Sequence, residues 1–148
     1  MKYFKRNKNY KYELAEDVSF PVPAEIGTAL SPFILQGMGA ITIKGGYAWD
    51  GSSVPLKRLV KFMTFGRCDL DRYCKQASLV HDAFYQLMRS RLLPRPYKAG
   101  IDRLYEKMCI AGGMGKREAA ARYWAVKTFG YRTLAPRYYP EKTILETN

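Results

Sequence analysis

The segment from residue 71 to residue 91 constrains the fold of this chain more than any other part. Its apolar residues recur at spacings of three and four, which is typical of a helix with one buried face. These residues are Leu79, Val80, Ala83, Phe84, Leu87 and Met88. The prolines of Leu93-Pro94-Arg95-Pro96 end the segment, because proline disrupts the interior of a helix. The pattern therefore predicts one long helix.

Two more helices are expected after this one. Residues 97–111 read as a partner helix that ends at Gly112-Gly113. Residues 116–129 predict a third helix, in which Ala119-Ala120-Ala121 and Trp124-Ala125 allow close packing. Residues 56–65 form a shorter amphipathic segment before the long helix.

The N-terminal third of the chain predicts strands. We expect them at residues 10–13, 18–26 and 37–44, with a hairpin turn at Gly45-Gly46 leading into residues 47–49. Pro21-Val22-Pro23 indicates a sheet edge or a turn, because proline lacks the N–H that a central strand donates. Residues 1–12 form a basic arm, and residues 131–148 form an aromatic, basic tail.

Together these elements predict an α+β fold. A small antiparallel sheet or hairpin would pack beside about three helices, two of them antiparallel and carrying the site. The length of 148 residues suits a single domain over residues 1–148, and the hydrophobic share of 47% predicts a folded protein. No apolar run reaches the length of a transmembrane helix.

His81 is the only histidine in the chain, and it stands next to Asp82 in the long predicted helix. Histidine accepts a proton near neutral pH, and does so best when a carboxylate fixes its ring. Adjacent helical residues point about 100° apart, so His81 and Asp82 would face neighbouring parts of one cleft. If Asp102 on the next helix orients His81, Asp82 is left for another task. With the loop Asp50-Gly51 it suits a calcium ion, which takes carboxylate and carbonyl oxygens.

Each of these residues also has a purely structural interpretation. A His-Asp pair is commonly part of a hydrogen-bonded core, Asp50-Gly51 fits a tight turn, and Asp102 can cap its helix. Tyr85 and Tyr105 can be packing residues with a polar tip. Small buried apolar roles are expected for the three cysteines, Cys68, Cys74 and Cys109.

The order of the motifs resembles the bacterial and fungal branch of the phospholipase A2 superfamily. That pattern runs Asp-Gly-x-Ser, a proline, an aromatic stretch, His-Asp-x-x-Tyr, and then an Asp followed by an aromatic residue and a methionine. The corresponding residues here are Asp50-Gly51-Ser52-Ser53, Pro55, Phe62 to Phe65, His81-Asp82-Ala83-Phe84-Tyr85, and Asp102 with Tyr105 and Met108.

Over roughly residues 10 to 130 the chain resembles even more a family of phage and prophage proteins, a domain of unknown function. That family has the same Asp-Gly-Ser-Ser-x-Pro and His-Asp-x-x-Tyr signatures. Its closing helix ends in Phe-Gly, here Phe129-Gly130.

The phospholipase resemblance implies a role for each site residue. His81 would be the general base that activates water against an ester carbonyl, Asp102 would orient it, and Tyr85 would hydrogen-bond to Asp102. Asp50, Asp82 and backbone carbonyls near Gly51 would hold calcium. The ion would act as a Lewis acid and stabilise the oxyanion at the attacked carbonyl.

The chain also departs from the phospholipase pattern. In the phospholipases a cysteine precedes the histidine by three residues and joins the two helices through disulfides, whereas Ser78 stands there in this chain. Three cysteines form no evident framework, and no apolar signal segment follows Met1. We expect a protein made in the bacterial cytoplasm, where thiols stay reduced and free calcium is low. Calcium-dependent catalysis would then wait for release from the cell or delivery by a virion.

The formal net charge of +12 predicts attraction to polyanions. Basic residues gather in the N-terminal arm, at Lys57-Arg58-Lys61, and from Arg89 to Arg95. An anionic phospholipid surface, an acidic virion or host protein, and non-specific nucleic acid all fit this charge. A merely solvated basic surface fits it equally well.

Two hypotheses follow from these patterns. The first is a calcium-dependent esterase of the phospholipase A2 type that acts on host membrane lipid, which the intact set of site residues favours. The second is a non-catalytic phage structural or accessory protein, in which His81 is locked into a hydrogen-bond network. The basic arm and the aromatic tail favour the second, because such termini commonly dock onto neighbouring subunits.

Overall fold

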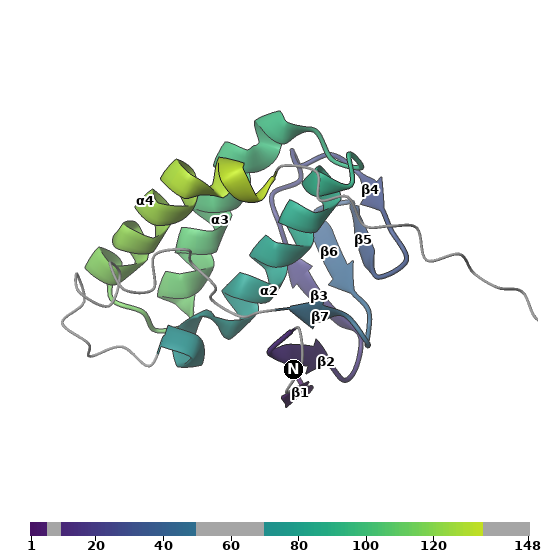
Figure 1. The fold of residues 1–148 in the computed structure, drawn as a ribbon, viewed down its shortest axis with the longest axis horizontal. Coiled ribbons are helices and arrows are strands. Elements are labelled where there is room, and N and C mark those ends of the chain that lie inside the picture. The colour runs from purple at the N-terminus through teal and green to yellow at the C-terminus, as the bar shows by residue number, and fades with distance from the viewer. Residues whose placement is uncertain (6–9, 50–69, 135–148) are drawn as a thin grey trace, which may run out of the picture.

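A computed structural model describes residues 1–5, 10–49 and 70–134 of the chain (Figure 1). Short strands come first: β1 (Tyr3–Lys5), β2 (Tyr12–Leu14), β3 (Val18–Pro21), β4 (Ala29–Leu30), β5 (Ile34–Gly37), β6 (Ala40–Ile43) and β7 (Ala48–Trp49). The helices follow: α2 (Leu70–Arg89), the 3-10 turn η1 (Arg95–Tyr97), α3 (Lys98–Ala111) and α4 (Lys116–Thr133). The predicted α+β class is confirmed, with three α-helices in the part of the chain described.

The strands form two antiparallel sheets rather than one. The larger sheet has the order β3-β6-β5-β4, and the smaller has the order β1-β2-β7. Alternation along β5 and β6 turns Ile34, Ile41 and Ile43 into the core, where all three are fully buried. The edge position of β3 agrees with the expectation from Pro21, which ends this strand.

The chain turns at Gly45-Gly46 as predicted, but the flanking strands β6 and β7 do not pair, so the turn does not make a hairpin. The apolar run 37–44 is not one strand, because the chain turns at Met38 and Gly39, which have φ angles of 51° and 75°. A two-residue turn with two positive φ angles suits the twist of a hairpin, and here it joins β5 to β6. Residues 48 and 49 then pair with β2, so they belong to the other sheet.

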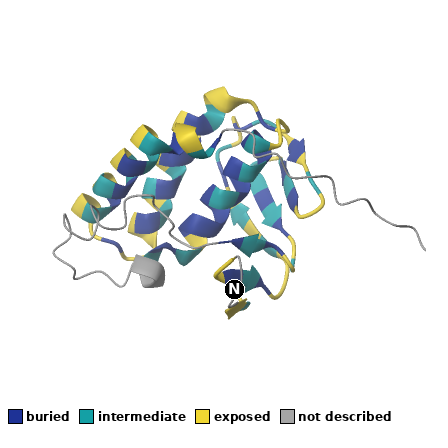
Figure 2. Ribbon diagram, in the orientation of Figure 1, coloured by how far each residue is buried: buried dark blue, intermediate teal, exposed yellow. Residues whose placement is uncertain are grey.

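Helix α2 lies between the sheets and the other two helices (Figure 1). Its six predicted apolar positions are all buried, and they join a core that includes Ile34, Ile41, Ile43 and Trp49 from the strands. Figure 2 shows burial along most of α2. The helix is buried on a second side too, because α3 packs there. A single apolar stripe therefore describes only part of what α2 buries.

The helix boundaries differ little from those expected. Helix α4 continues to Thr133, so residues 131–133 are helical rather than part of an extended tail. The amphipathic segment 56–65, the basic group Lys57-Arg58-Lys61 and the rest of the tail lie outside the described residues. Among the described helices none is long and apolar enough to cross a membrane.

The β5–β6 turn gives a first prediction. Met38 has a positive φ and a fully exposed side chain, so the substitution Met38→Asn removes backbone strain and loses no packing. We expect the free energy of unfolding to rise by about 0.5 kcal/mol, measured by urea denaturation. The control Leu30→Asn changes an exposed residue within β4 and should give no increase. An equal gain in both variants would contradict the explanation.

Candidate functional site

The contact between α2 and α3 is a seam of polar side chains. On α2 it uses positions 74, 78, 81 and 85, and on α3 positions 98, 102, 105 and 109, each with spacings of four, three and four. Such spacing places residues along one line of a helix. We call these eight residues the polar seam: Cys74, Ser78, His81, Tyr85, Lys98, Asp102, Tyr105 and Cys109. All eight are buried.

The centre of the polar seam is a hydrogen bond between His81 and Asp102. The Nε2 atom of His81 lies 3.1 Å from Oδ1 of Asp102. Asp102 is 1% exposed, and the side chain of His81 keeps 10% of its surface exposed. A neutral His81 that donates Nε2–H to this carboxylate keeps a lone pair on Nδ1, which can accept a proton from another group.

Two tyrosines hold the imidazole ring in place. The Tyr85 hydroxyl donates to the same Oδ1 atom of Asp102 at 2.8 Å, and the Tyr85 and His81 ring centroids are 4.1 Å apart. Tyr105 approaches from α3, and its ring centroid lies 4.8 Å from that of His81. The hydrogen bonds that the resemblance implied from His81 and Tyr85 to Asp102 are both present. The alternative role of Asp102 as a helix cap is wrong, because α3 begins four residues earlier, at Lys98.

Sequence reasoning missed Lys98. Its Nζ donates to Oδ2 of Asp102 at 2.6 Å and to the carbonyl oxygens of Val126 and Lys127 in α4 at 3.1 and 3.3 Å. The same atom lies 4.5 Å from the centre of the Tyr131 ring. A lysine at the start of a helix normally suggests a solvated charge, yet Lys98 is 2% exposed. The one available signal was its place four residues before Asp102, where an ion pair can form on a helix face.

Helix α4 approaches the polar seam closely because residue 130 is glycine. A Cβ atom at Gly130 would overlap the Tyr85 hydroxyl and would lie 3.1 and 3.2 Å from Cε and Nζ of Lys98. Two arginines also form hydrogen bonds with the C-terminal end of α4. Arg89 donates to the carbonyl oxygen of Thr133 at 3.4 Å, and Arg95 donates to that of Leu134 at 3.3 Å.

The charges of the site shift its pKa values in opposite directions. Burial lowers the pKa of His81, against the hydrogen bond to Asp102, and the positive charges of Lys98 and Arg89 lower it further. Burial alone would raise the pKa of Asp102, but the hydrogen bonds from His81, Lys98 and Tyr85 outweigh it, and the pKa is lowered. At pH 7 the site therefore combines a neutral imidazole with an ionised carboxylate.

The expected calcium ligands are only partly described. Asp82 lies beside His81 on α2 and is half-buried, whereas Asp50 and Gly51 fall outside the described residues. Within residues 1–5, 10–49 and 70–134, no group of three or more His, Cys, Asp or Glu side chains is arranged to hold a metal ion. The calcium site therefore stays a prediction.

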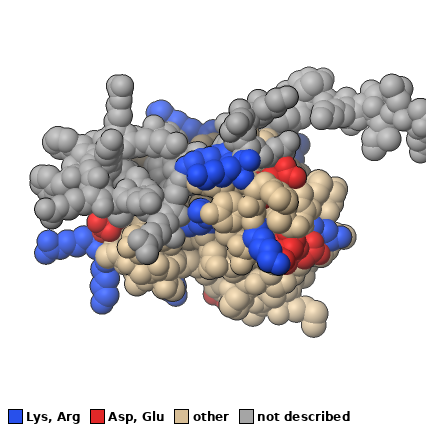
Figure 3. All heavy atoms as spheres, turned by 90° about the horizontal axis from the view of Figure 1, so that it is seen from below, with Lys and Arg blue, Asp and Glu red and all other residues tan. Residues whose placement is uncertain are grey.

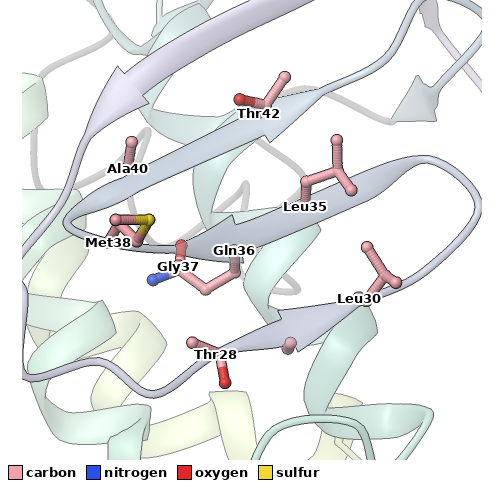
Figure 4. A pocket seen from close by; sticks show the side chains of 9 residues that line it. Thr28, Leu30, Leu35, Gln36, Gly37, Met38, Ala40 and Thr42 are labelled. Atoms are coloured by element: carbon pink, nitrogen blue, oxygen red, sulfur yellow. The ribbon is translucent and has the colours of Figure 1, made fainter.

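A hollow of about 450 Å³ lies elsewhere, on the four-stranded sheet (Figure 4). Its described lining comes from residues 28–30, 35–38, 40 and 42, and includes Leu30, Leu35 and Met38 but no titratable side chain. An apolar group could rest there. It supplies no acid or base, so the polar seam remains the candidate for chemistry.

One face of the molecule shows how the described basic side chains are distributed. On the face shown in Figure 3, lysine and arginine side chains lie in separate groups, some with acidic side chains beside them. In the predicted basic group from Arg89 to Arg95, two arginines bind carbonyl oxygens at the end of α4. Part of the excess charge thus has a structural use within the described residues.

Residues 28–126, more than half of the chain, match the family described as Protein of unknown function (DUF1353), so the chain belongs to this family. The matched range includes the whole polar seam and leaves out β1, β2 and β3. No curated protein and no solved structure gives a significant match to the chain. The activity therefore has to be argued from the geometry of the site.

The close approach of α4 gives a second prediction. Gly130→Ala adds a methyl group where Tyr85 and Lys98 already fill the space, and we expect it to lower the free energy of unfolding by about 1–3 kcal/mol. The matched control is Gly100→Ala in α3, whose Cβ would meet nothing within 4 Å. The control should stabilise the protein by up to about 1 kcal/mol, because alanine favours a helix over glycine. Equal stabilisation by both variants, in urea denaturation, would contradict the packing.

The buried imidazole gives a third prediction, for the dependence of stability on pH. The folded-state pKa of His81 lies below its usual value of 6.5, so the unfolded chain is protonated first as the pH falls. The stability contributed by the neutral ring is complete above about pH 6.5 and is lost as the pH drops towards the folded pKa. We expect the urea midpoint of His81→Asn to fall less between pH 7.5 and 5 than that of the wild type. Equal slopes would show that His81 does not titrate on unfolding.

Proposed function

We propose that this member of the DUF1353 family is a hydrolase that uses a His-Asp pair to activate water, with an ester of membrane phospholipid as its substrate. The observation that carries the proposal is the buried hydrogen bond of 3.1 Å between Nε2 of His81 and Oδ1 of Asp102. The resemblance to phospholipase A2 supports the reaction type, and it implied this pairing from the motifs alone.

In the proposed reaction, His81 acts through Nδ1. Within the described residues no hydrogen-bond partner occupies this atom, and its ring keeps some exposed surface. Nδ1 takes a proton from water, the water oxygen attacks the ester carbonyl, and the proton passes to the departing alkoxide. The ionised Asp102 stabilises the imidazolium and fixes the ring, and Tyr85 keeps the carboxylate in position.

Calcium fits the chemistry of the predicted carboxylate ligands. Asp82 adjoins His81 on α2, and Asp50 with the carbonyl of Gly51 would complete the ligands in this proposal. A bound calcium ion would supply Lewis-acid stabilisation of the negative charge on the attacked carbonyl oxygen.

The membrane substrate is supported by charge. A net charge of +12 favours an anionic bilayer, where each nearby lysine or arginine contributes roughly 1 kcal/mol of attraction. Among the described basic residues, Arg91 and Arg95 follow α2 in the chain and are exposed. This attraction would bring the protein to its substrate without an inserted helix.

A non-catalytic function is the second candidate, and Lys98 is the observation that favours it. Its ammonium lies 2.6 Å from Asp102 and neutralises the carboxylate that would otherwise stabilise an imidazolium. Asp102 then holds three helices together as a structural group. In this interpretation the protein is a phage structural or accessory component that docks on an acidic partner through its basic surface and termini.

The fourth prediction concerns hydrolysis. With calcium present, wild-type protein should release fatty acid from anionic liposomes, and His81→Ala should reduce kcat by about 10²–10⁴-fold because the base is lost. Asp82→Asn should weaken calcium binding in a titration and lower hydrolysis with it. Glu106→Gln is the control, because this carboxylate on α3 pairs with Arg103 at the surface.

The outcomes separate the two functions. Loss of activity in His81→Ala and Asp82→Asn, with Glu106→Gln unchanged, supports the esterase. Absence of both calcium binding and fatty-acid release in folded wild-type protein would overturn it and favour the docking function.

A further inference from the structure

The polar seam ends in two cysteines that the proposed reaction does not use. Cys74 on α2 stands seven residues before His81, and Cys109 on α3 stands seven residues after Asp102. Because the two helices are antiparallel, these equal offsets bring the thiols face to face, and the sulfur atoms are 3.5 Å apart. Both side chains are completely buried.

The surroundings of the two thiols are unequal. Cys109 donates its S–H to the sulfur of Cys74. This hydrogen bond lowers the pKa of Cys74, and the positive charge of buried Arg122 acts in the same direction. The contact with Cys74 and burial raise the pKa of Cys109. Cys74 is thus the better nucleophile of the pair. Cys109 is the thiol that can attack Cys74 once Cys74 has been oxidised.

Forming a bond would need a small movement of the two sulfur atoms. A disulfide needs a sulfur–sulfur distance of about 2.05 Å, so the two atoms must approach by about 1.5 Å. One neighbour of the pair is the sulfur of Met114, 3.9 Å from that of Cys74. Methionine is flexible and adapts to small movements in a core.

We infer that Cys74 and Cys109 form a redox-active dithiol, which hydrogen peroxide converts into a disulfide joining α2 to α3. The geometry that carries this inference is the direct contact of two thiols across antiparallel helices, beside a buried guanidinium. The inference is independent of the proposed hydrolysis, because it requires neither calcium nor substrate.

The reaction balances with peroxide as the oxidant. The Cys74 thiolate attacks one peroxide oxygen, the O–O bond breaks, and Cys74 becomes a sulfenic acid while the other oxygen leaves as water after taking up a proton. The Cys109 sulfur then attacks the Cys74 sulfur, the S–O bond breaks, and a second water leaves. Two thiols have lost two electrons and two hydrogens, and one peroxide has become two waters.

The fifth prediction tests the dithiol in native protein. The background variant Cys68→Ser leaves only the two seam cysteines. After peroxide treatment it should lose two hydrogens by intact mass and resist alkylation in denaturant until it is reduced. A peptide joining Cys74 to Cys109 should appear in the digest. The Tm should rise by about 5–15 °C, because the bond closes a loop of intermediate length.

Two matched variants serve as controls. Cys68→Ser combined with either Cys74→Ser or Cys109→Ser should fold, form no intramolecular disulfide, and show no rise in Tm with peroxide. The inference is overturned if folded Cys68→Ser protein keeps two alkylatable thiols after treatment. It is equally overturned if one cysteine proceeds to a sulfinic acid without forming the bond.

Discussion

The buried carboxylate of Asp102 is the group on which the arrangement of the helices depends. An ionised carboxylate with 1% exposure would be very unfavourable without partners, so each of its donors is needed. His81 and Tyr85 reach it from α2, and Lys98 reaches it from its own helix. Lys98 also binds two carbonyl oxygens of α4. One negative charge thereby fixes the positions of three helices relative to one another.

The polar seam also sets the register between α2 and α3. A seam of leucines would accept neighbouring registers at little cost, whereas polar layers pair only with particular partners. A slip of one turn would take Asp102 out of line with His81 and separate Cys74 from Cys109. The polar seam thus fixes one register between α2 and α3 but buries less apolar surface than a seam of leucines would. This is expected where side chains must meet at fixed distances.

Much of this arrangement was predictable, for a physical reason that differs between elements. The long helix was predictable because its apolar residues follow a helical period, and the meeting of His81 with Asp102 followed from the motif order. Lys98 was missed because burial of a charge depends on tertiary partners that no local pattern reveals. The turn at Met38-Gly39 was missed because an apolar run hides a turn when only its second residue is glycine. The catalytic roles and the ligands Asp50 and Gly51 stay predictions.

The contact between Lys98 and α4 has a consequence for how the protein is made. Translation produces the strands first, then α2, then the Lys98–Asp102 pair, while the carbonyl partners of Lys98 come later, at Val126 and Lys127. Until the ribosome has passed Gly130, the buried charges of the site lack the helix that covers them. The site therefore cannot be complete before α4 has been synthesised. Its last contacts form when α4 packs onto α3.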